Sequence, residues 1–482
     1  MPSAATDVAT RRAKLFIDGT WVAGAETLAV FDKFSGVPIG TADSASREQV
    51  GLAVAALDRA FRDRPLNVTE RYRILHRVSQ LIHDRRDDLA ATIVAESGLP
   101  ISNARLEVDR TAQTFIIAAE EAKRLVGEVV PIEAAPGHEH RVAWTIRVPR
   151  GVVCGITSFN SPLNSVAHKV APALAAGNTV IIKAAQATPF SAASVVEMLL
   201  EAGLPPGHIG LVQGRGSQVG SWLIENPLIR FFTFTGSTAV GRQLQKTVGL
   251  RPITLELGSI AATIVCEDAN LADAASRSVS AAFKRAGQVC TSTQKLLVQR
   301  SVLSSFTDLF LKGTSELLCG DPTDPRTAVG PMISEAEAER AEAWVEAAVA
   351  AGARVLAGGR RRGALLEPTV LTDTRPDMDV VAREIFAPVV SIIPFDDIDD
   401  AIAEVNASNS GLATGLFTRD IGRALASAKQ LRVGVVHIND ASTNRADLMP
   451  FGGVKDSGLG TEGPKYAMHE MTEQRLITVS LS

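Results

Sequence analysis

The sequence predicts an α/β protein built around parallel sheets, and two stretches of the chain carry that prediction. From residue 151 onward, short buried strands such as GVVCGIT alternate with helical segments such as VAHKVAPALAAG (166–177). Strands and helices that alternate in this way form a parallel sheet with helices on both faces, an arrangement that suits a dinucleotide. A second run of the same kind extends from about 259 to 450 and includes ARVLAGG, VVSIIPF and GVVHIN.

The segments before residue 151 predict a helical region between two β segments. Residues 1–14 are polar and expected to be frayed, whereas LFIDGTW (15–21) predicts two strands joined by a tight turn at Asp18-Gly19. Residues 46–126 place apolar side chains at three- and four-residue steps, which predicts amphipathic helices. Residues 129–149 then change to the alternation of an exposed strand, and helix is disfavoured there by Pro131, Pro136 and Pro149.

Composition argues against several classes of function. The net charge is −4 and the pI about 6.1, so nothing favours binding to nucleic acid or to an anionic membrane. No run of about 18 apolar residues predicts a membrane span, and the N-terminus shows no apolar signal segment. The four cysteines form no CxxC and have no histidine cluster, so we expect no metal and no disulfide framework. This usage predicts a reducing compartment, the cytoplasm.

Cys290 is the most informative residue, because it lies in a short glycine-containing turn between two regular elements. The segment 273–283 predicts a helix before it, and KLLVQ (295–299) predicts a strand after it. A thiol at such a junction is accessible and close to backbone amides, as a nucleophile needs. By itself, a lone cysteine is more typical of a small apolar side chain packed in a core. A carboxylate 34 residues earlier, Glu256 at the end of a strand-like run, makes chemistry the better interpretation.

Seven segments follow one another along the chain: SFNSPLN (158–164), VIIKAAQATP (180–189), FTGSTAVG (234–241), ELGS (256–259), GQVC (287–290), EIFAPV (384–389) and PFGGVKDSGLG (450–460). In this order and spacing they resemble the aldehyde dehydrogenase superfamily over nearly the whole length. The resemblance implies a Rossmann-like NAD(P)-binding domain (1–128 and 150–257), an α/β catalytic domain (258–467) and a small β oligomerisation flap (129–149 and 468–482).

The resemblance also implies a covalent mechanism. Cys290 would add to an aldehyde carbonyl, giving a thiohemiacetal whose oxyanion expels a hydride. The side-chain amide of Asn160 and the backbone N–H of Cys290 would stabilise that oxyanion, and Glu256 would act as general base for hydrolysis of the thioester. Lys169 and Glu462 match positions associated with proton relay. Taken alone, Asn160 also suits a turn or helix cap before a proline, and Glu256 a solvated strand end.

The cofactor site depends on the resemblance, because no GxGxxG follows the first strand of the parallel region. GSTAVG (236–241) opens a helix directly after a strand, so its amides would face a ligand above the sheet, although an ordinary strand-to-helix turn has the same pattern. The positions matched to cofactor contacts are Ile156, Thr157, Ser158, Phe159, Lys183, Gln186, Arg215, Gly216, Gly220, Phe234, Gly236, Ser237, Leu257, Glu384 and Phe386.

One cofactor position departs from the family pattern. Relatives commonly read Lys-Pro-x-Glu at the end of this strand, whereas this chain reads Lys183-Ala184-Ala185-Gln186. A glutamate accepts hydrogen bonds from the ribose hydroxyls and repels a 2′-phosphate, but a neutral amide can donate to one. Arg215 is expected nearby. We therefore expect NADP to be accepted, alongside NAD.

The segments around 158 and 441–460 resemble the branch that acts on small polar or anionic aldehydes, such as lactaldehyde, semialdehydes and phosphonoacetaldehyde. His168 lies where semialdehyde-oxidising relatives often carry Arg, and Lys284 lies six residues before Cys290, where they often carry a basic residue. Arg445 would reach the pocket mouth, and Arg110 lies on the helix expected to line the substrate tunnel. Each alone is more typical of a surface charge. Convergence of two or more would imply an anionic substrate.

Two other functions remain open from the sequence. A CoA-acylating semialdehyde dehydrogenase would need no general base, so Glu256 favours water as the acyl acceptor. A catalytically silent structural relative would not need Cys290, Glu256 and Asn160 together. As for partners, the alternating segment 141–148 and the strand-like RLITVSL (475–481) predict an exposed strand edge that another subunit would cover, so we expect a homodimer or homotetramer.

Overall fold

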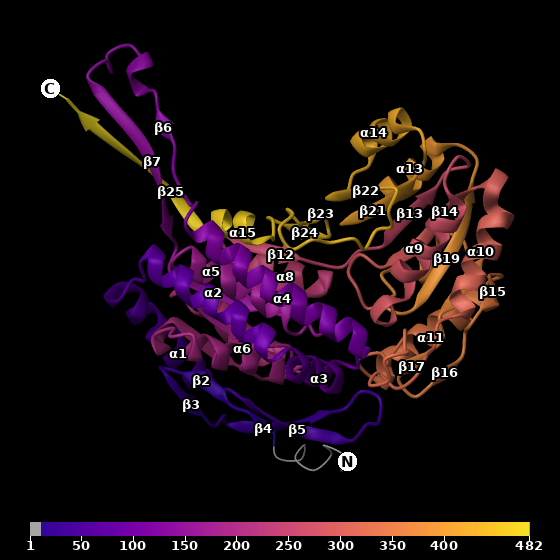
Figure 1. The fold of residues 1–482 in the computed structure, drawn as a ribbon, viewed down its shortest axis with the longest axis horizontal. Helices are drawn as coiled ribbons and strands as arrows, with labels where there is room; N and C mark the ends of the chain where they lie inside the picture. Colours follow the sequence, from indigo (N-terminus) through magenta and orange to yellow (C-terminus); the bar gives the residue numbers. More distant parts are fainter. Residues whose placement is uncertain (1–10, 482) are drawn as a thin grey trace.

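Two sheets organise the chain, as the alternation of strands and helices predicts (Figure 1). The computed structural model describes residues 11–481. The first sheet has eight strands with a parallel centre and antiparallel edges. In spatial order the strands are β24 (Gly458–Leu459), β12 (Ile253–Glu256), β11 (Ile229–Thr235), β8 (Val152–Ile156), β9 (Thr179–Lys183), β10 (Ile209–Val212), β2 (Leu15–Ile17) and β3 (Thr20–Val22).

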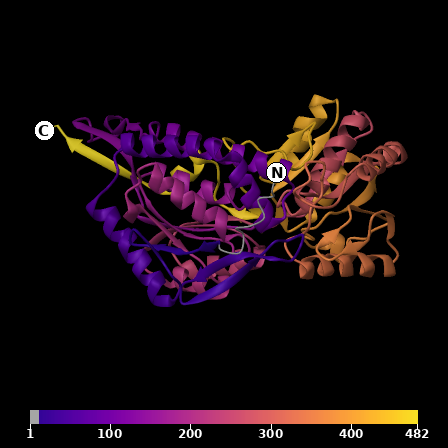
Figure 2. The ribbon, with the colours of Figure 1, turned by 60° about the horizontal axis from the view of Figure 1, so that its bottom comes forward.

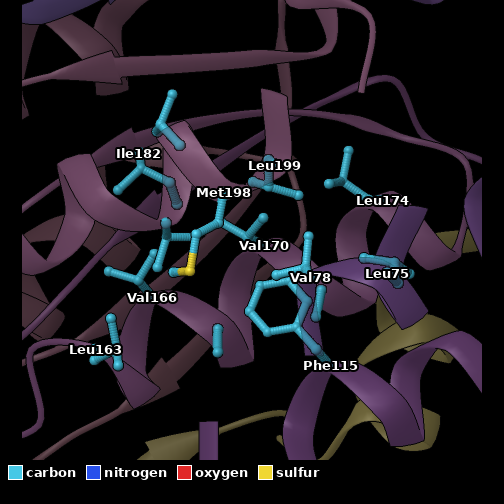
Figure 3. Close-up of a cluster of buried hydrophobic side chains, with 14 of the residues drawn as sticks. Leu75, Val78, Phe115, Leu163, Val166, Val170, Leu174, Ile182, Met198 and Leu199 are labelled. Atoms are coloured by element: carbon cyan, nitrogen blue, oxygen red, sulfur yellow. The ribbon is translucent and has the colours of Figure 1, made fainter. Parts of the chain in front are cut away.

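Both faces of this sheet are buried. Successive side chains of a strand point to opposite faces, and Val153 of β8 accordingly packs in one core while Val152 and Cys154 pack in the other. Figure 3 shows part of the larger core, where Phe115 lies among aliphatic side chains from several helices and from β9. The larger core is covered by α2 (Val68–Asp84), α3 (Arg86–Ser97), α4 (Ile101–Ala122), α5 (Asn164–Ala175) and α6 (Pro189–Glu201), and the other by α1 (Arg47–Asp63), α7 (Ser221–Glu225) and α8 (Thr238–Val248).

The N-terminal region follows the predicted hairpin but is more ordered than expected. Asp18 and Gly19 have φ values of 47° and 82°, the left-handed conformation that a two-residue hairpin turn requires. The expectation of a frayed segment is wrong for Arg12–Ala13, which form β1 and pair in parallel with β5 (Pro38–Ser44). Residues 1–10 lie outside the described part of the chain. The remaining strand of this small sheet is β4 (Glu26–Phe31).

The second sheet has seven strands and is parallel except at one edge. Its strands in spatial order are β15 (Arg354–Ala357), β18 (Thr369–Thr372), β19 (Val389–Phe395), β14 (Thr293–Gln299), β13 (Ala261–Val265), β21 (Ala413–Phe417) and β22 (Val435–Ile438). One face is covered by α9 (Leu271–Phe283), α10 (Leu303–Ser315), α11 (Glu335–Ala350) and α12 (Asp379–Ala382), and the other by α13 (Ile398–Ala407) and α14 (Ile421–Gln430). Short pairs join β16 (Arg361–Arg362) to β17 (Leu365–Leu366) and β20 (Ser410–Gly411) to β23 (Val454–Lys455).

A three-stranded flap projects away from both sheets (Figure 1), and Figure 2 shows its last strand extending from the body of the molecule. The predicted alternating segment is β7 (Arg141–Pro149), and it pairs along its whole length with β25 (Thr472–Ser480), which follows α15 (Pro464–Glu470). The third strand is β6 (Val129–Val130). The flap leaves apolar side chains exposed, among them Val129, Trp144 and Leu476. Within residues 11–481, no helix is long and apolar enough to cross a membrane.

Candidate active site

A cavity of about 860 Å³ lies where the loops after β8, β9, β11 and β12 face the turn between α9 and β14. The carboxyl edge of a parallel sheet is where α/β proteins bind ligands, because the loops that leave the strands separate there. Cys290, Glu256 and Asn160 all line this cavity, although they come from three separate segments of the chain. The structure therefore brings the three predicted catalytic side chains to one space.

The turn that carries Cys290 has an unusual backbone. Arg285, Ala286 and Gly287 are all left-handed, with φ values of 56°, 53° and 68°. Each non-glycine residue in this conformation costs about 1–2 kcal/mol, so tertiary contacts must hold the turn. At Gly287 a side chain is also excluded by space, since a β-carbon there would lie 2.0 Å from the carbonyl oxygen of Ala387. The turn thus fits tightly against the 384–389 segment.

A buried ion pair fixes this turn to the first sheet. Arg285 Nη1 lies 3.1 Å from Glu107 Oε2 and donates to the carbonyl oxygen of Asn160 at 2.7 Å. Glu107 lies on α4, and its Oε1 accepts hydrogen bonds from the backbone N–H groups of Leu163 and Asn164 at the start of α5. The side chains of Arg285 and Glu107 are 6% and 0% exposed. One ion pair therefore joins two helices of the first sheet to the cysteine turn.

Asn160 also ties its loop to the cysteine turn. Its Nδ2 donates to the carbonyl oxygen of Gln288 at 2.8 Å, and its Oδ1 accepts from Ser158 Oγ at 2.8 Å. A primary amide carries two N–H donors, so one contact to Gln288 leaves a second donor for an oxyanion in the cavity. The turn or cap role that Asn160 could have played alone is not what the structure shows.

Two carboxyl groups near Cys290 have opposite environments. Glu462 is held by cations at both oxygens: Lys169 Nζ donates to Oε1 at 2.7 Å and Arg445 Nη2 to Oε2 at 3.1 Å. Burial alone would raise the pKa of Glu462, but the charges of Lys169 and Arg445 outweigh it and hold that pKa below its ordinary value. Glu256, at the end of β12, has no hydrogen-bond partner for Oε1 among the described residues. Burial, and then the charge of Glu462, raise the pKa of Glu256 well above its ordinary value.

The thiol of Cys290 is neutral in this environment. Burial raises the pKa of Cys290 to about 12, the carboxyl of Glu256 adds to the rise, and Arg445 opposes it. A nucleophilic thiolate therefore requires a base that takes the proton, or a further positive charge in the cavity. Glu256 lines the same cavity and has the raised pKa that suits a proton acceptor from a thiol.

Most residues predicted to contact a cofactor line the cavity, but three do not. Gln186 and Arg215 are exposed on the loops that follow β9 and β10, which are neighbours in the sheet, and Gly220 is buried outside the cavity lining. Lys183 lines the cavity, donates to the Ala184 carbonyl oxygen at 2.9 Å, and has its pKa lowered to about 8 by burial. The others in the lining are Ile156, Thr157, Ser158, Phe159, Gly216, Phe234, Gly236, Ser237, Leu257, Glu384 and Phe386.

The segment that contains Glu384 packs closely against the loops of the first sheet. Glu384 accepts a hydrogen bond from the backbone N–H of Ser259 at 3.0 Å, and burial raises its pKa to about 7. A β-carbon at Gly258 would lie 2.1 Å from Glu384 Oε2, so only glycine leaves room for this carboxyl group. The Phe386 ring meets the Phe159 ring edge to face at 5.9 Å. Sequence reasoning missed three other residues of this wall, which no pattern marked: Arg340, Trp344 and Arg383.

All four predicted substrate residues line the cavity, and three of them contact acidic side chains that the sequence did not predict. Arg110 forms a bidentate ion pair with Asp447, at 2.7 and 3.0 Å, and His168 Nε2 lies 2.9 Å from the same carboxylate. Arg445 lines the cavity as well, and its Nη2 donates to Glu462 Oε2 at 3.1 Å. Asp447 organises this wall, yet an isolated acidic residue in a loop carried no signal in the sequence.

Lys284 is the basic residue of this wall that lacks an acidic partner. It is half-buried and forms no ion pair with a described residue, in contrast to Arg110, Arg285 and Arg445. Burial, and then the charges of Arg285 and Arg110, lower the pKa of Lys284 to about 8. Lys284 thus brings to the cavity a positive charge at neutral pH that no acidic side chain of the described residues compensates. Nowhere in residues 11–481 do three or more His, Cys, Asp or Glu side chains form a metal-binding group.

Comparison with known proteins agrees with this arrangement. The sequence model described as "Aldehyde dehydrogenase family" matches residues 21–477. The chain is 45% identical to a 3-sulfolactaldehyde dehydrogenase of Priestia aryabhattai over 467 residues, covering 97% of this chain and 98% of that protein. It is 38% identical to a lactaldehyde dehydrogenase of Methanocaldococcus jannaschii, covering 97% and 100%.

A solved structure, the NADP-dependent glyceraldehyde-3-phosphate dehydrogenase of Bacillus halodurans in complex with NADP, has a TM-score of 0.95 and 36% identity, covering 98% of this chain and 100% of that one. The chain therefore belongs to the aldehyde dehydrogenase family. This confirms the family, the fold and the class of enzyme that the seven segments predict.

Proposed function

We propose that the protein oxidises a small aldehyde with an anionic group to the carboxylic acid, with NAD or NADP as hydride acceptor. The observation that carries the proposal is that the Cys290 thiol and the Glu256 carboxyl face one cavity beside Asn160. A nucleophile, a base and an oxyanion donor within one space are the parts that acyl transfer through a thioester needs. The relatives named above oxidise aldehydes of this size.

The carboxyl edge of the first sheet fits the cofactor. Helix α8 begins directly after β11, so its free N–H groups face the cavity beside Gly236 and Ser237. Glu384 is a carboxyl acceptor suited to ribose hydroxyls. We propose that residues 1–128 and 150–257 bind the cofactor and that 258–467 carry the nucleophile. When bound, NAD(P)⁺ would supply a hydride acceptor and a positive charge.

The side chains of this chain account for the remaining chemistry. Glu256 takes the thiol proton, and the Cys290 sulfur adds to the aldehyde carbon to form a thiohemiacetal. The second N–H of the Asn160 amide and the backbone N–H of Cys290 stabilise its oxyanion. Loss of a hydride leaves a thioester. Once Glu256 has released the thiol proton to solvent, it takes a proton from water, the hydroxide adds to the acyl carbon, and the Cys290 thiolate leaves as the carboxylic acid forms.

The roles of Cys290 and Glu256 can be separated kinetically. Cys290→Ala should reduce turnover by a factor of about a hundred or more without loss of cofactor binding, because no other thiol of the described residues lines the cavity. Glu256→Gln should form about one NAD(P)H per active site in a slower first turnover, in which the positive charge of the cofactor must ionise the thiol, and then stall at the thioester. Stopped-flow absorbance at 340 nm with propanal measures both. Added CoA is the control: a CoA-acylating enzyme would turn over steadily in the Glu256→Gln variant, and this outcome would contradict hydrolysis.

Lys284 provides a test of the substrate class. A half-buried ammonium group without an acidic partner can donate a charge-assisted hydrogen bond to a carboxylate, sulfonate or phosphate. Such a bond is worth about 1.5–3 kcal/mol, or roughly ten- to a hundredfold in affinity. We propose that Lys284 binds the anionic end of the substrate, with Arg110 beside it. Because the pKa of Lys284 is about 8, this attraction is present below pH 8 and lost as the pH rises through it.

The measured quantity is the ratio of kcat/KM for an anionic aldehyde, such as succinate semialdehyde, to that for propanal. This ratio should fall as the pH rises past about 8 in the wild type, and be roughly ten- to a hundredfold lower at pH 7 in Lys284→Met. Lys284→Arg is the matched control, since it keeps the charge and should hold the ratio up to higher pH. A ratio that is independent of pH and unchanged in Lys284→Met would exclude this site for the anion.

Cofactor preference depends on Gln186 and Arg215 in the two adjacent loops. Neither side chain brings a carboxylate to this edge, so we propose that a 2′-phosphate is accepted there and that NADP is used alongside NAD. Gln186→Glu should lower the NADP/NAD ratio of kcat/KM about tenfold, since one close like-charge pair costs on the order of 1–2 kcal/mol at a partly exposed site. Arg215→Leu tests the contribution of the second loop to the same NADP/NAD ratio. No NADP turnover in the wild type, or an unchanged ratio in Gln186→Glu, would refute the proposal.

The exposed flap supports a homodimer or homotetramer. Strands β7 and β25 pair with each other, yet apolar side chains such as Trp144 and Leu476 remain exposed. We propose that residues 129–149 and 468–482 contact another copy of the chain, and that the free cysteines reflect a cytoplasmic location. Light scattering at micromolar concentration should give a dimer or tetramer, and Trp144→Glu with Leu476→Glu should weaken it. A wild-type monomer at that concentration would contradict the assignment.

A further inference from the structure

Arg445 lies inside the catalytic cavity, and two contacts hold it there. Its Nη2 donates to Glu462 Oε2 at 3.1 Å, and its guanidinium carbon lies 3.9 Å from the centre of the Phe451 ring. Phe451 and Glu462 form an antiparallel bridge, in which each backbone N–H donates to the other's carbonyl oxygen at 3.1 and 2.7 Å. The ring and the carboxylate are therefore fixed side by side, and the guanidinium is aligned with both.

The charges around Arg445 leave the catalytic pair in a net positive field. Glu462 is negative and is contacted by two cations, Arg445 and the fully buried Lys169. The Asp447 carboxylate is already occupied by Arg110, and burial and Arg445 together keep His168 neutral by lowering its pKa. The titratable or charged groups that face Arg445 and Glu462 are Lys169, His168, Glu256, Cys290 and Asp447, with Glu384 further along the cavity.

We propose that Arg445 is a positioning residue that decides which carboxyl group exchanges protons: while it is in place, Glu462 stays ionised and Glu256 alone takes protons from the thiol and from water. The proposal rests on the proposed roles of Cys290 and Glu256. It follows from the geometry because Arg445 contacts Glu462 and not Glu256. Each oxygen of Glu462 therefore contacts a cation, whereas Glu256 forms no ion pair with any residue of 11–481.

Removal of Arg445 changes the field at two reacting atoms. Glu462 would keep Lys169 only, and the net positive charge near Glu256 and Cys290 would fall by one. Both of these groups lose a cation that favours their ionised forms. A unit charge about 6–8 Å away at an effective dielectric constant near 20 moves a pKa by about 1–2 units. The effect is a shift along the pH axis, which loss of packing alone would not produce.

The test compares Arg445→Met with Arg445→Lys, which keeps the charge. The first readout is the pH midpoint of steady-state kcat with saturating propanal and cofactor, where turnover rises as Glu256 loses its proton. The second is the pH midpoint for alkylation of Cys290 by iodoacetamide in the protein without added cofactor. Arg445→Met should move both midpoints up by about 1–2 pH units, whereas Arg445→Lys should stay within about half a unit of the wild type.

Neutralisation of the partner Glu462 provides an independent test. Glu462→Gln removes the negative charge and should move both midpoints down, and the double variant Arg445→Met with Glu462→Gln should return them close to the wild type. The proposal would be overturned if folded Arg445→Met had the midpoints of the wild type. If that variant does not fold, wild-type midpoints in Glu462→Gln would overturn it. Failure of the proposed function is distinguishable, because it would appear as wild-type turnover in Cys290→Ala or Glu256→Gln, while alkylation would still report the thiol.

Discussion

The buried ion pair between Arg285 and Glu107 is the interaction on which the active site depends. It connects α4, the start of α5, the Asn160 loop and the cysteine turn, at a distance of 3.1 Å. The left-handed backbone at 285–287 is unfavourable for two L residues, so the turn persists because these tertiary contacts hold it. A buried charge whose partner is removed costs about 3–5 kcal/mol, which makes this pair hard to change on one side only. The two α/β units are thereby fixed relative to each other where the reaction takes place.

Burial and nearby charges together set the pKa values of the groups in this cavity. Two neighbouring carboxyl groups and the thiol of the cavity respond to burial in different ways. Glu462 stays charged because Lys169 and Arg445 reach it, whereas burial raises the pKa of Glu256 and of Cys290, neither of which forms an ion pair with a described residue. A cationic cofactor entering this space would favour ionisation of both. The Cys290 thiol thus becomes a nucleophile only when a positive charge or a base promotes its ionisation.

The basic residues of the cavity differ in their partners. Arg110 shares Asp447 with His168 and Arg445 contacts Glu462, whereas Lys284 has no acidic partner among the described residues. An anionic group on a small aldehyde would therefore find its free positive charge at Lys284. This is the contact on which the proposed substrate class rests.

The sequence by itself determined the fold class, the family and the approximate place of most elements, because periodicity is local and seven short segments kept their order and spacing. It also pointed to Cys290, Glu256 and Asn160, which the structure brings to one cavity. It could not assign partners: Asp447 and Glu107 lie far in the chain from the arginines they pair with, and the direction of Arg445 depends on Phe451 and Glu462. It also missed the order of Arg12–Ala13, which comes from pairing with a distant strand. Protonation and substrate orientation depend on such long-range contacts, and these only the tertiary structure decided.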